Sequence, residues 1–174
     1  MFSYGNIIYY PVFFTATIRH WKRLLKPEKY KKIIIEQLRE QIKKNQLIVY
    51  AYCIMDNHVH IIWQVKGDIE TSEVQKQFLE KCSKHIKADL EIHHPNVLPF
   101  FKSTQNDKGY HFWKRCAKSK ELYDDIIFEQ KLDYIHYNPV KAGLCNLPEE
   151  YLYSNASYYE KVNLSDEILT HYRG

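Results

Sequence analysis

The chain has 174 residues, of which 45% are hydrophobic and 26% charged, and its formal net charge is +4. This length is most simply one domain with a substantial core, and the mild positive charge is compatible with a polyanionic partner. No apolar run approaches the ~20 residues of a membrane helix, and neither a signal peptide nor a glycine-rich nucleotide-binding loop is visible. We therefore expect no membrane association and no nucleotide cofactor. The cysteines form no C-x-x-C pair, so we expect reduced thiols in a cytoplasmic protein.

Strand and helix patterns alternate through the first 65 residues. β-Branched and aromatic residues crowd the first segment, where Pro11 bends the strand or places it at an edge, and Pro27 fits the first turn of a helix. Asp56 and Asn57 are typical of a two-residue turn between strands. The expected elements are a strand over residues 7–18, a helix over 27–44, and strands over 47–55 and 58–65.

The rest of the chain predicts two long helices, one further strand and a tail. Apolar residues at helical spacing follow Thr71, and Pro95 and Pro99 break the chain after them. Asn138 and Pro139 are expected to end the last helix. The expected elements are a helix from residue 71 or 72, a turn over 106–109, a strand over 110–115, a helix over about 124–137, and a peripheral tail over 148–174.

The predicted order is strand–helix–strand–strand–helix–strand, followed by an extra helix. This order predicts an α+β fold of the ferredoxin-like, split βαβ type, in which an antiparallel sheet carries helices on one face. The additional C-terminal helix bears Tyr134, and the opposite face of the sheet is free to carry a site.

His58 and His60 lie one residue apart within an apolar, β-favouring run. Alternate residues of a strand point to the same face, about 6.6 Å apart, so the two imidazoles can converge on one divalent ion. Such an ion needs a third ligand. The alternative for this pair taken by itself is two surface histidines on a solvent-exposed strand.

A candidate third ligand lies in KLDYIHYNPVKAGL, residues 131–144. Tyr134 and Asn138 are four residues apart and share a helix face. A tyrosine hydroxyl can act as a nucleophile, and an asparagine carbonyl can complete a metal shell. Tyr137 and Tyr123 are rival tyrosines, but of these three only Tyr134 has an asparagine four residues further on.

Basic and aromatic residues are mixed in two segments, around Trp21 and after Trp113. This mixture suits phosphates and unstacked bases, although each cluster taken alone equally fits a solvated loop. The predicted DNA-binding residues are Arg19, Lys22, Arg23, Lys114, Arg115, Lys118 and Lys120.

Two stretches match a known family. IMDNHVHIIW resembles the HUH motif of the one-tyrosine transposases, in which two histidines flank a hydrophobic residue. YIHYNPVKAGL resembles the tyrosine-helix motif of the REP-associated tyrosine transposases. The resemblance covers most of the chain, from the first strand to the segment YLYSNASYY, and implies one HUH transposase-like domain over residues 1–174. Asp56 is a departure, because many relatives have proline there.

The resemblance implies a metal-dependent single-stranded DNA endonuclease and strand transferase that acts on hairpin-containing repeat DNA. Tyr134 would be the nucleophile and form a 5′-phosphotyrosine link, while His58, His60 and Asn138 would hold Mg²⁺ or Mn²⁺. The implied partners are single-stranded or hairpin DNA, in the cytoplasm and associated with the nucleoid. A monomer and a homodimer are both compatible with the sequence.

Two other functions stay open on the residues alone. A domesticated, non-catalytic protein could use the same fold to bind structured nucleic acid, since ferredoxin-like sheets also serve RNA-binding modules. A metal-dependent hydrolase of a small substrate would instead need a closed pocket.

Overall fold

The computed structural model describes the chain apart from residues 1, 5–6, 45, 104–108, 162–167 and 174. Its strands are β1 (Phe2–Tyr4), β2 (Ile7–Tyr9), β3 (Val12–Thr17), β4 (Leu47–Ile54), β5 (His58–Val65) and β6 (Lys118–Glu121). Its helices are α1 (Glu28–Lys43), α2 (Thr71–His93), α3 (Asp125–Lys141) and α4 (Ala156–Tyr159), with short 3-10 helices η1 (Arg19–Trp21), η2 (Pro95–Phe101) and η3 (Pro148–Glu150). Among the described residues, no helix is both long and apolar enough to cross a membrane.

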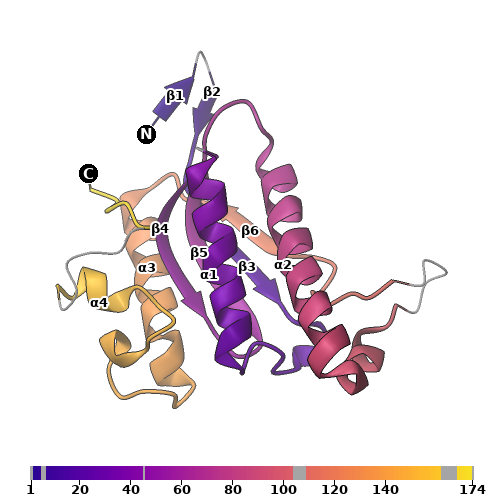
Figure 1. Ribbon diagram of the computed structural model, residues 1–174. Coiled ribbons are helices and arrows are strands. Elements are labelled where there is room, and N and C mark those ends of the chain that lie inside the picture. Colours follow the sequence, from indigo (N-terminus) through magenta and orange to yellow (C-terminus); the bar gives the residue numbers. More distant parts are fainter. Residues whose placement is uncertain (1, 5–6, 45, 104–108, 162–167, 174) are drawn as a thin grey trace.

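Four strands form the main sheet in the order β4-β5-β3-β6, and every neighbouring pair is antiparallel. Helices α1 and α2 lie side by side on one face of the sheet, and α3 lies behind it (Figure 1). Strands β1 and β2 pair with each other outside the main sheet. The order β3–α1–β4–β5–α2–β6 confirms the predicted ferredoxin-like topology, with α3 as the additional tyrosine-bearing helix.

Two hydrophobic clusters on opposite faces of the sheet account for this layering. On one face, Ile34 of α1 and Phe78 of α2 pack with Trp63 of β5. On the other, Ile135 of α3 packs with Ile62, the neighbour of Trp63 along the strand. Adjacent strand residues point to opposite faces, so one strand serves both clusters. Because α3 covers the second face, β4 and β5 are buried almost throughout.

The first predicted strand is interrupted at Tyr10 and Pro11, which separate β2 from β3. Proline has no backbone N–H to donate to a ladder, and its ring fixes the backbone angle φ. The Pro11 carbonyl still accepts a hydrogen bond of 2.8 Å from the backbone N–H of Leu122, just beyond β6. Pro11 was predicted to bend the strand or to place it at an edge; the strand is interrupted there, but β3 lies inside the sheet and not at its edge.

The fourth strand was predicted in the wrong place. Residues 110–115 contribute only isolated bridges, from Tyr110 to Lys102 and from Trp113 to Ile18, whereas β6 is Lys118–Glu121. In this segment Phe112 and Trp113 are buried in the core and Tyr110 packs against it, but none of them belongs to a ladder. The real strand, KSKE, is exposed along its whole length and carries no hydrophobic alternation. The turn expected over 106–109 lies almost entirely outside the described residues.

Helix α3 continues through Pro139, beyond its predicted end. The helix begins at a side-chain cap, since Oδ1 of Asp124 accepts hydrogen bonds from the backbone N–H groups of Ile126 and Ile127 at 2.8 and 3.2 Å. Proline removes a single hydrogen bond here, and the N–H of Ala142 still bonds the carbonyl of Asn138 at 3.1 Å. Asn138 is consequently a true helical residue.

The chain beyond η3 packs on the free edge of β4. The buried side chain of Asn155 accepts a 2.7 Å hydrogen bond from the N–H of Tyr52 and donates to the carbonyl of Tyr50. The N–H of Ile54 donates to the carbonyl of Tyr153 at 2.8 Å. These contacts satisfy backbone groups of an edge strand, which would otherwise be exposed.

Candidate active site

His58 and His60 lie on the face of β5 that α3 covers. Their ring centroids are 4.7 Å apart and their planes make an angle of 74°. Val59 between them is buried in the cluster on the opposite face, as the strand alternation predicts. His60 is only 4% exposed and His58 is partly exposed, so the pair leads from the interior of the protein to its surface.

Hydrogen bonds fix the tautomer of each ring. Nδ1 of His58 lies 2.7 Å from Oδ1 of Asn57, which can only accept, so Nδ1 carries the proton. Nε2 of His60 lies 3.2 Å from Nδ2 of Asn138, an amide donor, and Nδ1 of His60 lies 2.8 Å from the hydroxyl of Thr15. In both rings Nε2 is therefore the unprotonated nitrogen, the form that binds a metal, and in His60 its lone pair accepts the hydrogen bond from Asn138.

The environment also keeps both rings neutral. Burial, and after it the charges of His58 and Lys131, lowers the pKa of His60 from 6.5 to about 3. Burial likewise lowers the pKa of His58, against a contact with Asn138 that raises it. At neutral pH both imidazoles are free to donate an electron pair.

Tyr134 and Asn138 reach the same place from α3. The phenol ring of Tyr134 lies edge-on to the His60 ring, with centroids 5.3 Å apart, and also contacts Phe13 at 6.0 Å. Tyr134 remains 41% exposed. It lines a hollow of about 480 Å³ together with Gln130, Asp133, Tyr137 and Lys141. One helix face thus presents a phenol to solvent beside the imidazoles that Asn138 contacts.

The predicted ligand set fits a divalent ion by its chemistry. Two imidazole nitrogens and an amide oxygen are donors that suit a first-row ion with further positions open. The Asn138 amide turns its Nδ2 toward His60 here and would present Oδ1 to an ion after a half-turn of the amide. Within the described part of the chain, no cluster of three or more His, Cys, Asp or Glu residues could hold a metal ion. A site here would therefore depend on Asn138 as its third donor, and this assignment stays a prediction.

Two lysines on α3 were not singled out from the sequence. Nζ of Lys131 and of Lys141 lie 5.6 and 5.7 Å from the centroid of the Tyr134 ring. Lys131 also lies 5.2 Å from the ring of Phe13. The signal was available, because positions three before and seven after Tyr134 share its helix face. Two ammonium groups beside the phenol make this face attractive to a phosphate.

The rival tyrosines are placed differently. Tyr137 is 51% exposed and lines the same hollow as Tyr134, while Tyr123 precedes α3 and is more exposed still. His136, between the two helix tyrosines, faces the other way and is buried against Asn155. The ring contact with His60 belongs to Tyr134, which favours Tyr134 over Tyr137 without testing its role.

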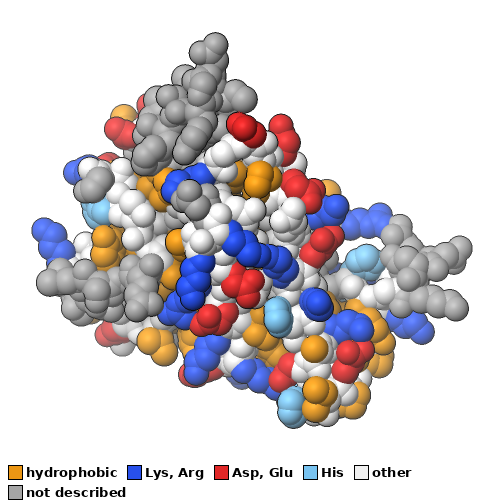
Figure 2. All heavy atoms as spheres, turned by 45° about the horizontal axis from the view of Figure 1, so that its top comes forward, with side chains coloured by type: hydrophobic (Ala, Val, Ile, Leu, Met, Phe, Trp, Pro, Cys, Tyr) orange, Lys and Arg blue, Asp and Glu red, His pale blue; other side chains and the backbone are white. Residues whose placement is uncertain are grey.

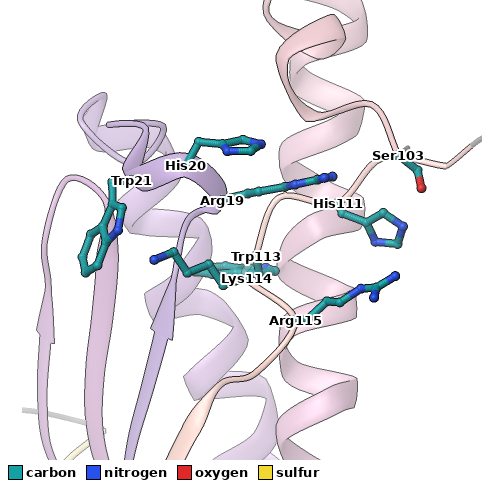
Figure 3. A pocket seen from close by; sticks show the side chains of 8 residues that line it. All are labelled: Arg19, His20, Trp21, Ser103, His111, Trp113, Lys114 and Arg115. Carbon is teal, nitrogen blue, oxygen red and sulfur yellow. The ribbon is translucent and has the colours of Figure 1, made fainter. Parts of the chain in front are cut away.

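The predicted DNA-binding residues divide into three groups. Arg19, Lys114 and Arg115 line a groove of about 710 Å³, shown in Figure 3, together with Trp21, whose ring contacts that of His58. Lys22 lies over the ring of Phe100, and Arg23 is bound to Asp56 at 2.6 Å. Lys118 and Lys120 lie on β6, whose residue 118 stands in register with Thr15.

This register determines which face the β6 lysines occupy. Thr15 pairs with Lys118 on one side and with His60 on the other, so all three share the face of the histidine site. Strands β6 and β5 are separated by β3, so the backbones of Lys118 and His60 lie about 10 Å apart, twice the distance between neighbouring strands. On the face with α1 and α2, Figure 2 shows Lys and Arg side chains interspersed with Asp and Glu. Several of those charges pair between and within the helices, such as Lys29 with Asp89.

Asp56 is a structural residue. Its carboxylate accepts hydrogen bonds from the buried Lys31 at 2.8 Å and from Arg23. Burial raises the pKa of Asp56, but the hydrogen bonds from Lys31 and Arg23 outweigh it and hold the pKa below its ordinary value. Arg23 was predicted to bind DNA, and the structure gives it this ion pair.

Comparisons with known proteins agree with the two motifs. No family model matches the chain. A protein of Haemophilus influenzae named "Putative REP-associated tyrosine transposase" is 26% identical over 110 residues, a match covering 60% of this chain and 56% of that protein. The chain thus spans little more than half the length of the curated relative it matches.

Solved structures show the same fold. A REP-associated tyrosine transposase bound to a REP hairpin superposes with a TM-score of 0.62 at 16% identity, over 99% of this chain and 97% of that one. A transposase described as putative, from Deinococcus radiodurans R1, superposes with a TM-score of 0.52 at 13% identity, over 78% and 98% of the two chains. Sequence similarity and shared fold together confirm that this chain resembles the REP-associated tyrosine transposases.

Proposed function

We propose that this chain is a metal-dependent single-stranded DNA endonuclease and strand transferase, acting on hairpin-containing repeat DNA. The observation that carries the proposal is the meeting of His58, His60 and Asn138 with the exposed phenol of Tyr134. The named relative bound to a REP hairpin supports a hairpin substrate. An ordinary core would have no physical reason to gather these four groups at a solvent-facing edge.

Tyr134 attacks the scissile phosphate in this proposal. The bond between phosphorus and the phenolic oxygen forms while the bond to the 3′ oxygen breaks, and the phenolic proton ends on the freed 3′-OH. The 5′-phosphotyrosine conserves the bond energy, so attack by another 3′-OH rejoins strands without ATP. A divalent ion held by His58, His60 and Asn138 would polarise the scissile phosphate as a Lewis acid.

The neighbouring residues position the DNA. Lys131 and Lys141 flank the phenol and attract the phosphate that Tyr134 attacks. Thr15 and Asn57 hold the two imidazoles in one tautomer. Lys118 and Lys120 extend the positive charge along the edge of the same sheet face.

A covalent-adduct assay tests this function. A labelled single-stranded hairpin is incubated with the protein and Mn²⁺, and the protein–DNA adduct is resolved on a denaturing gel. We expect an adduct from the wild type and from Tyr137→Phe but none from Tyr134→Phe. An adduct that persists in Tyr134→Phe and vanishes in Tyr137→Phe contradicts the assignment of the nucleophile.

The alternative function is a non-catalytic protein that binds structured nucleic acid. The edge-on packing of Tyr134 against His60 and Phe13 is also what a purely structural tyrosine would show. This alternative predicts retarded migration of the hairpin in native gels and no adduct under any metal condition. The two functions therefore give different results on the same samples.

A further inference from the structure

The turn at Trp21 presents an indole to solvent beside the candidate active site. Trp21 is 58% exposed, whereas Trp63 is 0% and Trp113 9% exposed. Its ring lies 6.5 Å from that of His58, at an angle of 78°. Figure 3 shows Trp21 projecting from the turn, next to Lys114 at the edge of the basic groove.

The backbone of this turn is held in a conformation that side-chain-bearing residues rarely adopt. His20 and Trp21 both have positive φ angles, 58° and 56°. Hydrogen bonds anchor the turn on both sides, from the N–H of Arg19 to the carbonyl of Phe112 at 2.7 Å and from the N–H of Trp21 to the carbonyl of Ile18 at 3.0 Å. These hydrogen bonds stabilise the strained turn, and in this conformation the turn holds the large ring of Trp21 in solvent.

Asn57 connects this turn to the histidine site. Its Nδ2 donates to the carbonyl of Trp21 at 3.5 Å, while its Oδ1 accepts from Nδ1 of His58 at 2.7 Å. One amide therefore orients a candidate metal ligand and the turn that carries the indole. The position of Trp21 is fixed relative to the place where a phosphate would bind.

Charge around the indole is suited to a nucleotide. Nζ of Lys114 lies 3.9 Å above the Trp21 ring, a cation–π contact that covers one face. Because the side chain is still more than half exposed, the remaining indole surface is open to a ligand. Arg19 and Arg115 line the adjoining groove of about 710 Å³. An aromatic platform beside a cationic groove matches the needs of an unpaired base and its phosphates.

We propose that Trp21 is a nucleobase-binding residue that stacks on an unpaired base of single-stranded DNA, next to the scissile phosphate at the site of His58, His60 and Asn138. The location of that phosphate rests on the proposed function, whereas the stacking itself does not. A duplex offers no free base face along its length, so the site selects unpaired DNA.

Trp21 fluorescence provides a direct test. The other two tryptophans are largely or fully buried, so the difference between wild type and Trp21→Phe isolates the signal of the exposed indole. We expect a single-stranded oligonucleotide to quench that signal. An abasic oligonucleotide of the same length and charge, and a blunt duplex of the same sequence, should leave it nearly unchanged.

Affinity measurements complete the test. Trp21→Ala is expected to weaken single-strand binding roughly 5- to 100-fold, while Trp21→Phe, which keeps an aromatic face, stays within a few-fold of wild type. Tyr123→Ala removes another exposed aromatic ring and serves as the matched control. Equal quenching by the abasic oligonucleotide, or unchanged affinity in Trp21→Ala, overturns the inference.

Adduct formation by the wild-type protein, measured alongside, separates the two proposals. A normal adduct without base-dependent quenching leaves the proposed function standing and removes the stacking role. Base-dependent quenching without any adduct supports the stacking role and contradicts the proposed function.

Discussion

Nδ2 of Asn138 lies 3.2 Å from Nε2 of His60, although the two residues are 78 positions apart in the chain. The contact joins α3 to β5 at the point where Nε2 faces the site. Asn138 lies within α3, which continues through Pro139 to Lys141, so the helical backbone holds Asn138 beside His60.

The first prediction concerns Asn138 as a metal donor. Asn138→Ala should weaken Mn²⁺ binding by at least about tenfold, since changes even outside the first ligand shell cost 10- to 100-fold. Asn138→Asp, which offers a charged oxygen in the same place, should bind Mn²⁺ at least as tightly as wild type. Titration calorimetry measures both, and equal affinity in all three proteins would exclude Asn138 from the ligand set.

The second prediction concerns Thr15, which fixes the tautomer of His60. Thr15→Val keeps the shape and the β-branch but removes the hydroxyl, so we expect a 10- to 100-fold loss of Mn²⁺ affinity or adduct yield. Thr71→Val is the control, because it removes a hydroxyl of the same residue type at the start of α2, on the opposite face of the sheet. Equal losses in both variants would show that the effect does not come from the contact with His60.

Local spacing was sufficient to predict the two halves of the site. The shared face of His58 and His60 follows from strand alternation, and the shared face of Tyr134 and Asn138 follows from the helical repeat. Both depend on residues at most four apart, where backbone geometry alone decides direction. The ferredoxin-like order of elements could be predicted for the same reason.

Contacts between distant segments could not be predicted. Thr15 meets His60 across 45 residues only because of the register between β3 and β5. Strand β6 has no hydrophobic pattern, so the sequence favoured the aromatic segment at 110–115 instead. Arg23, predicted to contact DNA, also pairs with the carboxylate of Asp56, a partner that no local pattern indicated. In each case a residue or strand distant in the sequence, and not the local pattern, determined which contacts form.

The third prediction concerns acid stability. Burial lowers the pKa of His136 from 6.5 to about 4, despite a hydrogen bond with Asn155 that raises it. Between pH 6.5 and pH 4, His136 is protonated in the unfolded chain but neutral in the folded chain. Its full contribution to the free energy of unfolding is therefore present above pH 6.5 and is lost as the pH decreases toward 4. His60 acts in the same direction.

Denaturant unfolding at pH 7.5 and pH 5 measures the effect. We expect His136 to contribute on the order of 1–2 kcal/mol to the loss of stability over this interval. His136→Gln, which keeps an amide near Asn155 but does not titrate, should show a correspondingly smaller loss. A variant as acid-sensitive as wild type would show that the proton is taken up elsewhere.

The fourth prediction concerns Lys131 and Lys141 as phosphate-binding residues. Lys131→Ala and Lys141→Ala should each weaken hairpin binding and lower the slope of log affinity against log salt by about 0.7 to 0.9. Lys32→Ala is the control, because Lys32 is exposed on α1, on the opposite face of the sheet. An unchanged salt slope in the α3 variants would place the DNA backbone away from Tyr134.

The last prediction concerns the groove residues Lys114 and Arg115. Charge reversal of both, Lys114→Glu with Arg115→Glu, should reduce affinity for single-stranded DNA by more than tenfold at low salt, and the effect should shrink as salt screens the groove. The same reversal at Lys32 should have little effect, because Lys32 lies on α1 and is not among the residues that line the groove. Filter binding at several salt concentrations measures all three proteins. Unchanged affinity in the double variant would mean that the second basic segment is a solvated loop, and that any DNA contact near the histidines comes from the α3 lysines and β6.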